Sequence, residues 1–375
     1  MNCRRIIFGG HAVVCAVLAV AALLCVGVGS SIAAPSVSSV SGTVSNGQSI
    51  TITGSSFGSG PNVILFDDFS QGTSGSTISL TGPEVGSYYS LEGAPKPVYS
   101  SAQSHHPPNS LYCYTTGSTG SPDNWECRTN IALTSGTQVF VSWWMYISGT
   151  MSENFKTMWA QQGLDNSTSG DLSGPVWGIS GAQYGTGVYG SNALDFADWG
   201  INGGPTLTAG TWTRFWHLLD STTANYILAW QIVPGKGVVQ VSSAAAGPYG
   251  GGGWYGGTPW TYLQIPAYEG DDNANTQATY IADLYVATGP NAMARVEIGN
   301  ASTYNACTNL TIVTPTSWNA SSITATVRQG SFGSSGSAYL YVLDATGTPN
   351  ANGYPVSFGG GSTAPAAPSG LHLEE

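Results

Sequence analysis

The sequence predicts an all-β protein whose largest part is an antiparallel two-sheet sandwich. Hydrophobic residues make up 41% of the 375 residues and aromatic residues 11%, so a large core can form although only 8% are charged. Short β-branched and aromatic runs alternate with clusters of Gly, Ser, Asn and Pro, a pattern typical of strands joined by turns. No helical periodicity of useful length follows the N-terminal segment.

Residues 1–33 are predicted to form a secretory signal peptide. Arg4 and Arg5 precede an apolar stretch over residues 13–28, and Ser31-Ile32-Ala33 fits a cleavage site of small residues. The apolar stretch is too short and too early for a convincing membrane span, and no other stretch is long enough. We therefore expect a secreted protein, extracellular or at the cell surface, without membrane insertion.

The charge balance narrows the range of partners. Without Arg4 and Arg5, seven of the nine basic side chains remain against 20 acidic ones, a net charge of −13. Phosphate binding needs cationic side chains, so nucleic acid is excluded as an expected partner. The same balance weighs against a strongly polyanionic glycan unless a groove concentrates the few cations.

The first strands after the signal resemble a known family. The run Ile50-Thr51-Ile52-Thr53-Gly54-Ser55-Ser56-Phe57-Gly58 is similar to the opening of IPT/TIG immunoglobulin-like domains, and residues 316–327, around Trp318, resemble a later strand of that family. Residues 338–342 and 354–358 would be its last strands. The resemblance implies an immunoglobulin-like domain formed by residues 34–61 and 291–360 and split by an insertion. The alternative is an N-terminal hairpin plus a small separate C-terminal domain.

The predicted insertion spans residues 62–290 and contains many strand candidates, at 62–69, 110–114, 138–148, 155–161, 211–219, 226–233, 261–265 and 279–286. The Asp67-Asp68-Phe69 opening, the Ser-His-His-Pro-Pro-Asn-Ser-Leu segment at 104–111 and the closing Tyr280-Ile-Ala-Asp-Leu-Tyr-Val run resemble concanavalin A-like lectin/glucanase jelly rolls. This superfamily includes carbohydrate-binding modules, lectins, glycoside hydrolases and polysaccharide lyases. Together the two resemblances imply a secreted bacterial-type protein. Residues 361–375 are predicted to be a flexible tail.

The strand predicted at 138–148 has two different faces. Val139, Val141, Trp143, Met145 and Ile147 form an apolar face, whereas Phe140, Ser142, Trp144, Tyr146 and Ser148 mix rings with hydroxyls. The mixed face suits the CH-rich faces of sugars. The alternative is that both faces are buried, with the serines as small packing residues.

The cysteines suggest one disulfide. Cys113 and Cys127 flank a loop of turn residues between two predicted strands, and a disulfide between them is plausible in a secreted protein. Cys307 is left over and is predicted to be a buried thiol. No Cys/His spacing resembles a zinc site.

Carboxylate pairs for glycoside hydrolysis are not evident. The retaining β-glucanases that the resemblance includes carry a Glu-x-Asp-x-x-Glu strand, which this chain lacks. Asp195 and Asp198 would face opposite ways on a strand, and Glu269, Asp271 and Asp272 lie in a turn-like segment. A polysaccharide lyase would need a base and groups that stabilise a uronate anion. The candidates for those roles are His217, Lys156, Tyr146, Arg128 and Tyr262, each of which could instead be structural.

The leading hypothesis is a secreted carbohydrate-binding protein that recognises a polysaccharide through an aromatic groove. Eleven of the twelve tryptophans lie between Trp125 and Trp260. Glutamines such as Gln264 add donors and acceptors for hydroxyl groups. The residues predicted to bind carbohydrate are Trp144, Tyr146, Trp159, Gln161, Trp230, Gln231, Trp254 and Tyr255. The alternatives are a polysaccharide-degrading enzyme, with a lyase favoured over a hydrolase, and a structural surface or appendage protein.

No organic cofactor is expected, but the resemblance implies a structural Ca²⁺ between the first and last strands of the jelly roll. Asp67, Asp68 and Asp283 stand at the corresponding places, and carboxylate oxygens suit this hard cation. The alternative is that these side chains cap strand ends.

Overall fold

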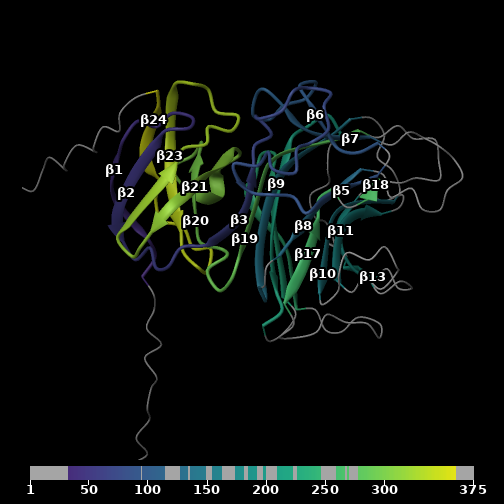
Figure 1. Cartoon of the computed structure of the whole chain (residues 1–375). Helices are drawn as coiled ribbons and strands as arrows, with labels where there is room; N and C mark the ends of the chain where they lie inside the picture. Colours follow the sequence, from purple (N-terminus) through teal and green to yellow (C-terminus); the bar gives the residue numbers. More distant parts are fainter. Residues whose placement is uncertain are drawn as a thin grey trace, which may run out of the picture. The chain divides into compact units, whose positions relative to one another are not determined.

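The computed structural model describes residues 33–93, 95–114, 127–133, 136–148, 154–162, 174–180, 185–191, 197–199, 209–222, 226–245, 259–266, 268–269 and 278–359. Every strand pair in these ranges is antiparallel, and the only helical element is the short 3₁₀ turn η2 (Tyr304–Ala306). Figure 1 labels most of the strands along the chain. The all-β prediction is therefore confirmed for the described residues.

Nine strands form the sheet that contains the long strand predicted at 138–148. Its main order is β16-β15-β14-β9-β19-β3-β4, with β7 paired to β19 and β6 to β7. The strands are β3 (Asn62–Asp67), β4 (Val85–Gly86), β6 (Val98–Ser100), β7 (Ser110–Tyr114), β9 (Gln138–Ser148), β14 (Thr213–Asp220), β15 (Tyr226–Val233), β16 (Gly237–Ala245) and β19 (Ala278–Thr288).

An eight-stranded sheet covers one face of the nine-stranded sheet. Its order is β13-β12-β11-β10-β17-β8-β5, with β18 paired to β10. The strands are β5 (Ser90–Glu92), β8 (Arg128–Ala132), β10 (Asn154–Gln162), β11 (Gly174–Ser180), β12 (Gly185–Ser191), β13 (Ala197–Trp199), β17 (Trp260–Gln264) and β18 (Tyr268–Glu269). One apolar core joins the two sheets, and it includes Val141, Trp143 and Met145 from β9 with Met158, Leu263 and Ile131. This is the predicted two-sheet antiparallel sandwich.

A seven-stranded sheet combines the two ends of the described chain, in the order β1-β2-β22-β21-β20-β23-β24. Its strands are β1 (Ser36–Ser41), β2 (Ser49–Ser55), β20 (Arg295–Gly299), β21 (Leu310–Trp318), β22 (Ser322–Thr326), β23 (Gly336–Leu343) and β24 (Tyr354–Phe358). Strand β2 pairs with β22, where Ile52 lies opposite Ile323. The purple strands β1 and β2 therefore belong to the same sheet as the yellow strand β24 (Figure 1).

This third sheet has its own apolar core, which contains Val40, Ile52, Val296, Leu340 and Val356. The Trp318 indole donates a hydrogen bond to the Phe57 carbonyl (3.2 Å), tying the N-terminal strands to a residue far along the chain. Such pairing between distant segments is what an insertion between β2 and β20 requires.

Both faces of β9 are buried. The apolar face lies in the sandwich core, and the mixed face packs in a second cluster that joins Phe140, Trp144 and Tyr285 to Leu310 and Tyr341. Among the strand's residues only Gln138, Tyr146 and Ser148 are half-buried. The interpretation of the mixed face as a half-wet sugar platform is thus wrong for most of its length. The alternative of two buried faces describes it, with Ser142 fully enclosed.

Cys113 and Cys127 form a disulfide with a Cα–Cα distance of 5.5 Å, and Cys307 is a buried free thiol. Among the described residues, no helix has the length and apolar character needed to cross a membrane.

Candidate functional site

The outer face of the eight-stranded sheet carries a row of polar side chains. On β8, Ile131 points into the sandwich core, so the alternating residues Arg128 and Asn130 point the other way. On β17, Leu263 is in the core and Gln264 lies on the same outer face. Strand β5 adds Glu92 beside Arg128. We call Glu92, Arg128, Asn130 and Gln264 the amide–guanidinium row.

Hydrogen bonds connect the row end to end. The Arg128 Nε donates to Glu92 Oε2 (2.7 Å), and its Nη2 makes a shorter contact to the same oxygen. The Asn130 amide donates to Glu92 Oε1 (2.7 Å) and receives a bond from Gln264 Nε2 (2.8 Å). The Gln264 Oε1 is buried and has no hydrogen-bond partner in the part of the chain that the structure describes. A buried acceptor left unused costs free energy and is a common sign of a site for a ligand or an ordered water.

Two tyrosines flank the row. Tyr262 lies within β17, one residue before Leu263, and is half-buried. Tyr89 precedes β5 and is 56% exposed. Their rings lie edge to face, with the ring centroids 5.6 Å apart. Aromatic bodies with hydroxyl tips beside amide donors and acceptors can bind a sugar ring through both its CH face and its hydroxyl groups.

The row is electrically balanced, because the Glu92 carboxylate offsets the Arg128 guanidinium. Both charged groups are largely enclosed, with side-chain exposures of 6% for Arg128 and 23% for Glu92. The arrangement therefore presents oriented dipoles and one held guanidinium, and no free excess charge.

Some predicted residues lie next to this row in the strand register. The backbone of Trp159 is opposite Gln264, and that of Gln161 is opposite Tyr262. The side chains of Trp159, Gln161 and Lys156 lie outside the described residues, as do Trp254 and Tyr255 entirely. Of the predicted site residues, the structure brings Arg128 and Tyr262 to this face.

His217 lies elsewhere. It is fully buried in the interior of the sandwich, where its ring stacks on Trp143 at a centroid distance of 5.2 Å. Burial lowers the pKa of His217 to about 3, which keeps the ring neutral. Because the ring lies between the two sheets and not on an outer face, it is out of reach of a polysaccharide, and the geometry separates His217 from Arg128 and Tyr262.

The remaining predicted ring residues are spread over the nine-stranded sheet. Trp144 is buried, stacks on His105 at 3.9 Å and donates its indole N–H to the Leu310 carbonyl (3.3 Å). Tyr146 is half-buried near Trp212. Trp230 and Gln231 alternate on β15: Trp230 is half-buried, whereas Gln231 is almost fully buried. The predicted groove is therefore not assembled from these side chains.

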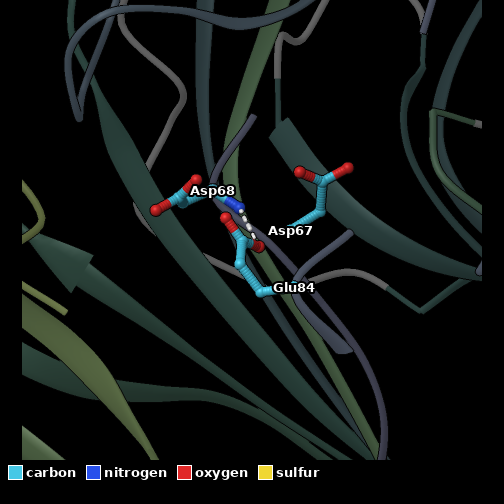
Figure 2. A group of neighbouring side chains, drawn as sticks. All are labelled: Asp67, Asp68 and Glu84. Carbon is cyan, nitrogen blue, oxygen red and sulfur yellow. Dashed lines mark hydrogen bonds between the residues drawn. The ribbon is translucent and has the colours of Figure 1, made fainter. Parts of the chain in front are cut away.

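A separate acidic group lies where β3 ends. Asp67, Asp68 and Glu84 each place one carboxylate oxygen within 4.8 Å of the others (Figure 2). The backbone N–H of Asp68 donates to Glu84 Oε2 (3.2 Å), and the Tyr88 hydroxyl donates to Asp67 Oδ2 (2.9 Å). Three oxygen donors at this spacing could hold a cation.

Burial and mutual repulsion shift the pKa values of these three carboxyl groups. Burial raises the pKa of Asp67 to about 7, and the charges of Asp68 and Asp283 add to the shift. Burial and the Asp68 carboxylate raise the pKa of Glu84 to about 9. Burial would also raise the pKa of Asp68, but its bonds with His106, Glu84 and Ser70 hold that pKa below the ordinary value. A bound cation would offset this repulsion.

Asp283, the third acid predicted to bind metal, lies beside His105, whose Nδ1 is 3.2 Å from Asp283 Oδ2. It is buried and adopts a left-handed backbone conformation (φ 50°). The acid that completes the close group is Glu84, which the sequence interpretation did not select.

Sequence reasoning also missed Glu92 and Asn130. The alternating pattern of Arg-Thr-Asn-Ile-Ala over residues 128–132 places Arg128 and Asn130 on one face, and this signal was available. Glu92 and Glu84 lie in short segments between turns, where no periodicity points to them.

No protein-family model and no curated protein matches this chain. Among solved structures it is similar to "Cellulose induced protein, Cip1" (16% identity, 60% of this chain and 97% of that one, TM-score 0.39). It is also similar to an endo-β-1,4-glucuronan lyase from the fungus Trichoderma reesei (10% identity, 55% and 92%, TM-score 0.40). A third similar structure is the alginate lyase Aly36B (12% identity, covering 61% of this chain and 97% of that one, TM-score 0.40).

Proposed function

We propose that this protein is secreted and binds a polysaccharide across the outer face of the eight-stranded sheet. The observation that carries the proposal is the buried amide–guanidinium row with its unused Gln264 acceptor, set beside the exposed Tyr89 and the half-buried Tyr262. The tyrosines pack against the CH faces of sugar rings, and the row bonds their hydroxyl groups. The balanced Arg128–Glu92 pair and the net acidic chain favour a neutral or weakly charged glycan.

The test is retention of the mature protein on immobilised polysaccharides, neutral and uronate-containing. Gln264→Leu and Tyr262→Phe are expected to weaken retention on the preferred glycan by about tenfold or more, because each removes an oriented polar group from the site. Tyr114→Phe, on β7 of the other sheet, is the matched control and should leave retention unchanged. Full retention by the Gln264 and Tyr262 variants would place the glycan elsewhere.

A second candidate is a polysaccharide lyase, favoured by the presence of Arg128, Asn130, Gln264 and Tyr262 on one face. The amides and the guanidinium would bond a uronate carboxyl. Tyr262, in its phenolate form, would take the proton from the adjacent carbon, and the phenol so formed would return that proton to the leaving oxygen. The bond to the glycosidic oxygen then breaks, a carbon–carbon double bond forms, and the leaving oxygen takes up a proton. Mass spectrometry of uronate glycans after incubation decides this: unsaturated products that vanish in Tyr262→Phe support it, and an intact panel excludes it.

We also propose that Asp67, Asp68 and Glu84 hold a structural Ca²⁺. The fit rests on three hard oxygen donors within 4.8 Å and on the repulsion that raises the pKa values of Asp67 and Glu84. Calcium should raise the melting temperature of the wild type, and a chelator should lower it. Glu84→Gln should remove this response, and Asp283→Asn tests whether the acid implied by the resemblance takes part. A melting temperature indifferent to calcium and chelator would contradict the proposal.

We infer, finally, that residues 34–61 and 291–360 form an IPT/TIG-type immunoglobulin-like domain that acts as a spacer or platform for the sandwich of residues 62–290. The pairing of β2 with β22 and the shared core of that sheet support this division. Residues 1–33 would be removed on export, leaving an extracellular or cell-surface protein.

A further inference from the structure

A cavity of about 260 Å³ lies between the nine-stranded sheet and residues that flank β20 and β23. Strands β14, β15 and β16 provide one wall, and the turn around η2 and the loop after β23 provide the other. The lining residues are Trp216, Trp230, Val238, Gln240, Met293, Arg295, Tyr304, Asn305, Gly347 and Pro349. Pockets for drug-sized ligands have about 300–1,000 Å³. This cavity is therefore sized for a single small ring.

The sheet wall combines aromatic rings with amide side chains, a combination that suits a sugar ring and its hydroxyl groups. Trp216 and Trp230 lie opposite each other in the register of β14 and β15, with ring planes only 8° apart and centroids 6.4 Å apart. Gln240 lies opposite Trp230 on the next strand and is exposed. Asn305 faces it from η2 and is also exposed. Indole surface with amides on both sides can hold a ring and its hydroxyl groups.

An excess of positive charge lies beside the cavity, where Arg295 of the other wall and Arg214 of β14 share one carboxylate. Glu297 is fully buried between two arginines: its Oε1 accepts from Arg214 Nη2 (2.5 Å) and lies 3.1 Å from Arg295 Nε. One carboxylate thus faces two guanidinium groups. Among the described residues, Arg214 Nη1 has no hydrogen-bond partner although it is buried. Because Glu297 neutralises only one of the two arginines, one positive charge remains uncompensated within this cluster.

Arg295 has donors left for a ligand. Its Nη1 donates to the Met293 carbonyl (2.8 Å) and its Nη2 to the Tyr304 hydroxyl (2.9 Å). Each terminal nitrogen of a guanidinium has two N–H bonds, so one remains on each. Arg295 lines the cavity and is the cationic side chain among its lining residues.

One cation and one acid lie near the lining residues in the sequence. Lys236 is exposed in the turn before Gly237, whose Cα approaches the Asn305 carbonyl so closely that a Cβ would lie 2.2 Å from that oxygen. Asp344 is the acid nearest in sequence to the lining residues Gly347 and Pro349. Its Oδ1 accepts bonds from the N–H groups of Thr346 and Thr348, so that oxygen is held within its own turn.

We propose that this cavity binds one carboxylated sugar residue, a uronic acid, as a second site distinct from the amide–guanidinium row. The indoles contact the ring, Gln240 and Asn305 bond its hydroxyl groups, and the guanidinium of Arg295 receives its carboxylate. Charge-assisted bonds to a carboxylate are about twice as strong as neutral ones, which separates a uronate from a neutral sugar of the same shape. The site would give the protein a preference for glycans with occasional uronate residues.

The experiment is titration of the mature protein with glucuronate, galacturonate and glucose, followed by tryptophan fluorescence and by calorimetry. At least one uronate should bind about tenfold or more tightly than glucose. Trp230→Leu should abolish that binding. Gln240→Ala, a change of an exposed side chain, should weaken uronate binding even if Trp230→Leu fails to fold. Lys236→Ala should weaken uronate binding more than glucose binding.

Two controls separate this site from the proposed polysaccharide face. Trp212→Phe alters an indole outside the cavity and should leave uronate binding intact. Gln264→Leu should likewise leave uronate binding intact even where it abolishes polysaccharide retention. Equal binding of glucose and both uronates, or uronate binding unchanged in Gln240→Ala and in folded Trp230→Leu, would overturn the proposal. Loss of uronate binding in Gln264→Leu would assign the uronate to the other site.

Discussion

Two arginine–glutamate networks lie on the outer faces of the two sheets of the same sandwich, and they differ in what covers them. In one, Glu297 joins Arg214 of β14 to Arg295 of β20 and also accepts the Tyr304 hydroxyl (2.6 Å). In the other, Glu92 joins Arg128 to Asn130 within a single sheet. The side chain of Glu297 is 0% exposed and that of Glu92 is 23% exposed.

The comparison shows that burial changes the role of the same pair of residue types. Glu297 has three donors, two from strands of different sheets and one, Tyr304, from η2, so its network links elements that are far apart in the sequence. Glu92 belongs to a row that ends in an unused acceptor beside an exposed tyrosine, so its network is available to a ligand. We therefore expect changes in the first network to affect mainly stability, apart from the role of Arg295 in the proposed uronate site, and changes in the second to affect mainly binding.

The largest effect is expected for Glu297→Gln. The substitution leaves two buried guanidinium groups without a counter-charge, and removing one partner of a buried ion pair costs about 3–5 kcal/mol. Urea denaturation followed by circular dichroism measures the free energy of unfolding. Replacing Arg214, Arg295 and Glu297 together by apolar residues should recover much of the loss. A Glu297→Gln variant as stable as the wild type would remove the contrast between the networks.

His217 sharpens the comparison because it lies on β14, on the opposite strand face from Trp216. Its pKa of about 3 is below its ordinary value, so the folded protein keeps it neutral while the unfolded chain protonates it below about pH 6.5. This contribution to stability is complete above pH 6.5 and is lost as the pH falls, at about 1.4 kcal/mol per pH unit.

In His217→Leu this acid-dependent loss should vanish, amounting to a difference of about 2 kcal/mol in pH dependence between pH 6.5 and pH 5. Denaturation of both proteins at several pH values measures it. Polysaccharide retention at pH 7 should not change, since the ring is enclosed. Parallel stability curves for the two proteins would show that His217 does not titrate as its burial implies.

Glu92→Gln is the direct counterpart of Glu297→Gln and should cost only about 1–2 kcal/mol, because water can reach part of the network and solvate Arg128. Polysaccharide retention should nevertheless fall, since the row loses the group that orients Arg128 and Asn130. The same denaturation assay and the retention assay measure both effects. A stability loss as large as that of Glu297→Gln would mean that both networks contribute equally to the stability of the fold.

The smallest effect on stability is expected for Tyr89→Ala. The ring is 56% exposed, so the free energy of unfolding should change by less than about 0.5 kcal/mol. Retention on the preferred glycan should fall about fivefold, because an aromatic contact contributes about 1 kcal/mol. Unchanged retention would restrict the binding face to Tyr262 and the row.

The sequence predicted the sandwich because alternation of side chains along a strand is a local property. Val141, Trp143 and Met145 had to share a face whatever the partner was, and the structure places them in one core. The prediction for the other face was wrong for a long-range reason: Trp144 and Phe140 are covered by Leu310 and Tyr341, which no local pattern connects to β9.

The same distinction applies to the candidate site. Arg128 and Tyr262 could be selected from their strands, but their relation to Glu92 depends on the pairing of β5 with β8. His217 was attractive as a base because histidine titrates near neutral pH. The second sheet that encloses it changes that property, and this sheet is assembled from segments on both sides of β14.

The pairing of β2 with β22 also sets the order in which the chain can mature. At ordinary rates of synthesis of about 5–20 residues per second, Thr53 is made roughly 15–50 s before its partner Ser322. During that interval β1 and β2 are a two-stranded ribbon with an open edge, which is not stable alone. The sandwich can be completed before the seven-stranded sheet. Under the proposed export, a chain kept extended until its synthesis is complete would have less chance to pair β1 and β2 with other chains.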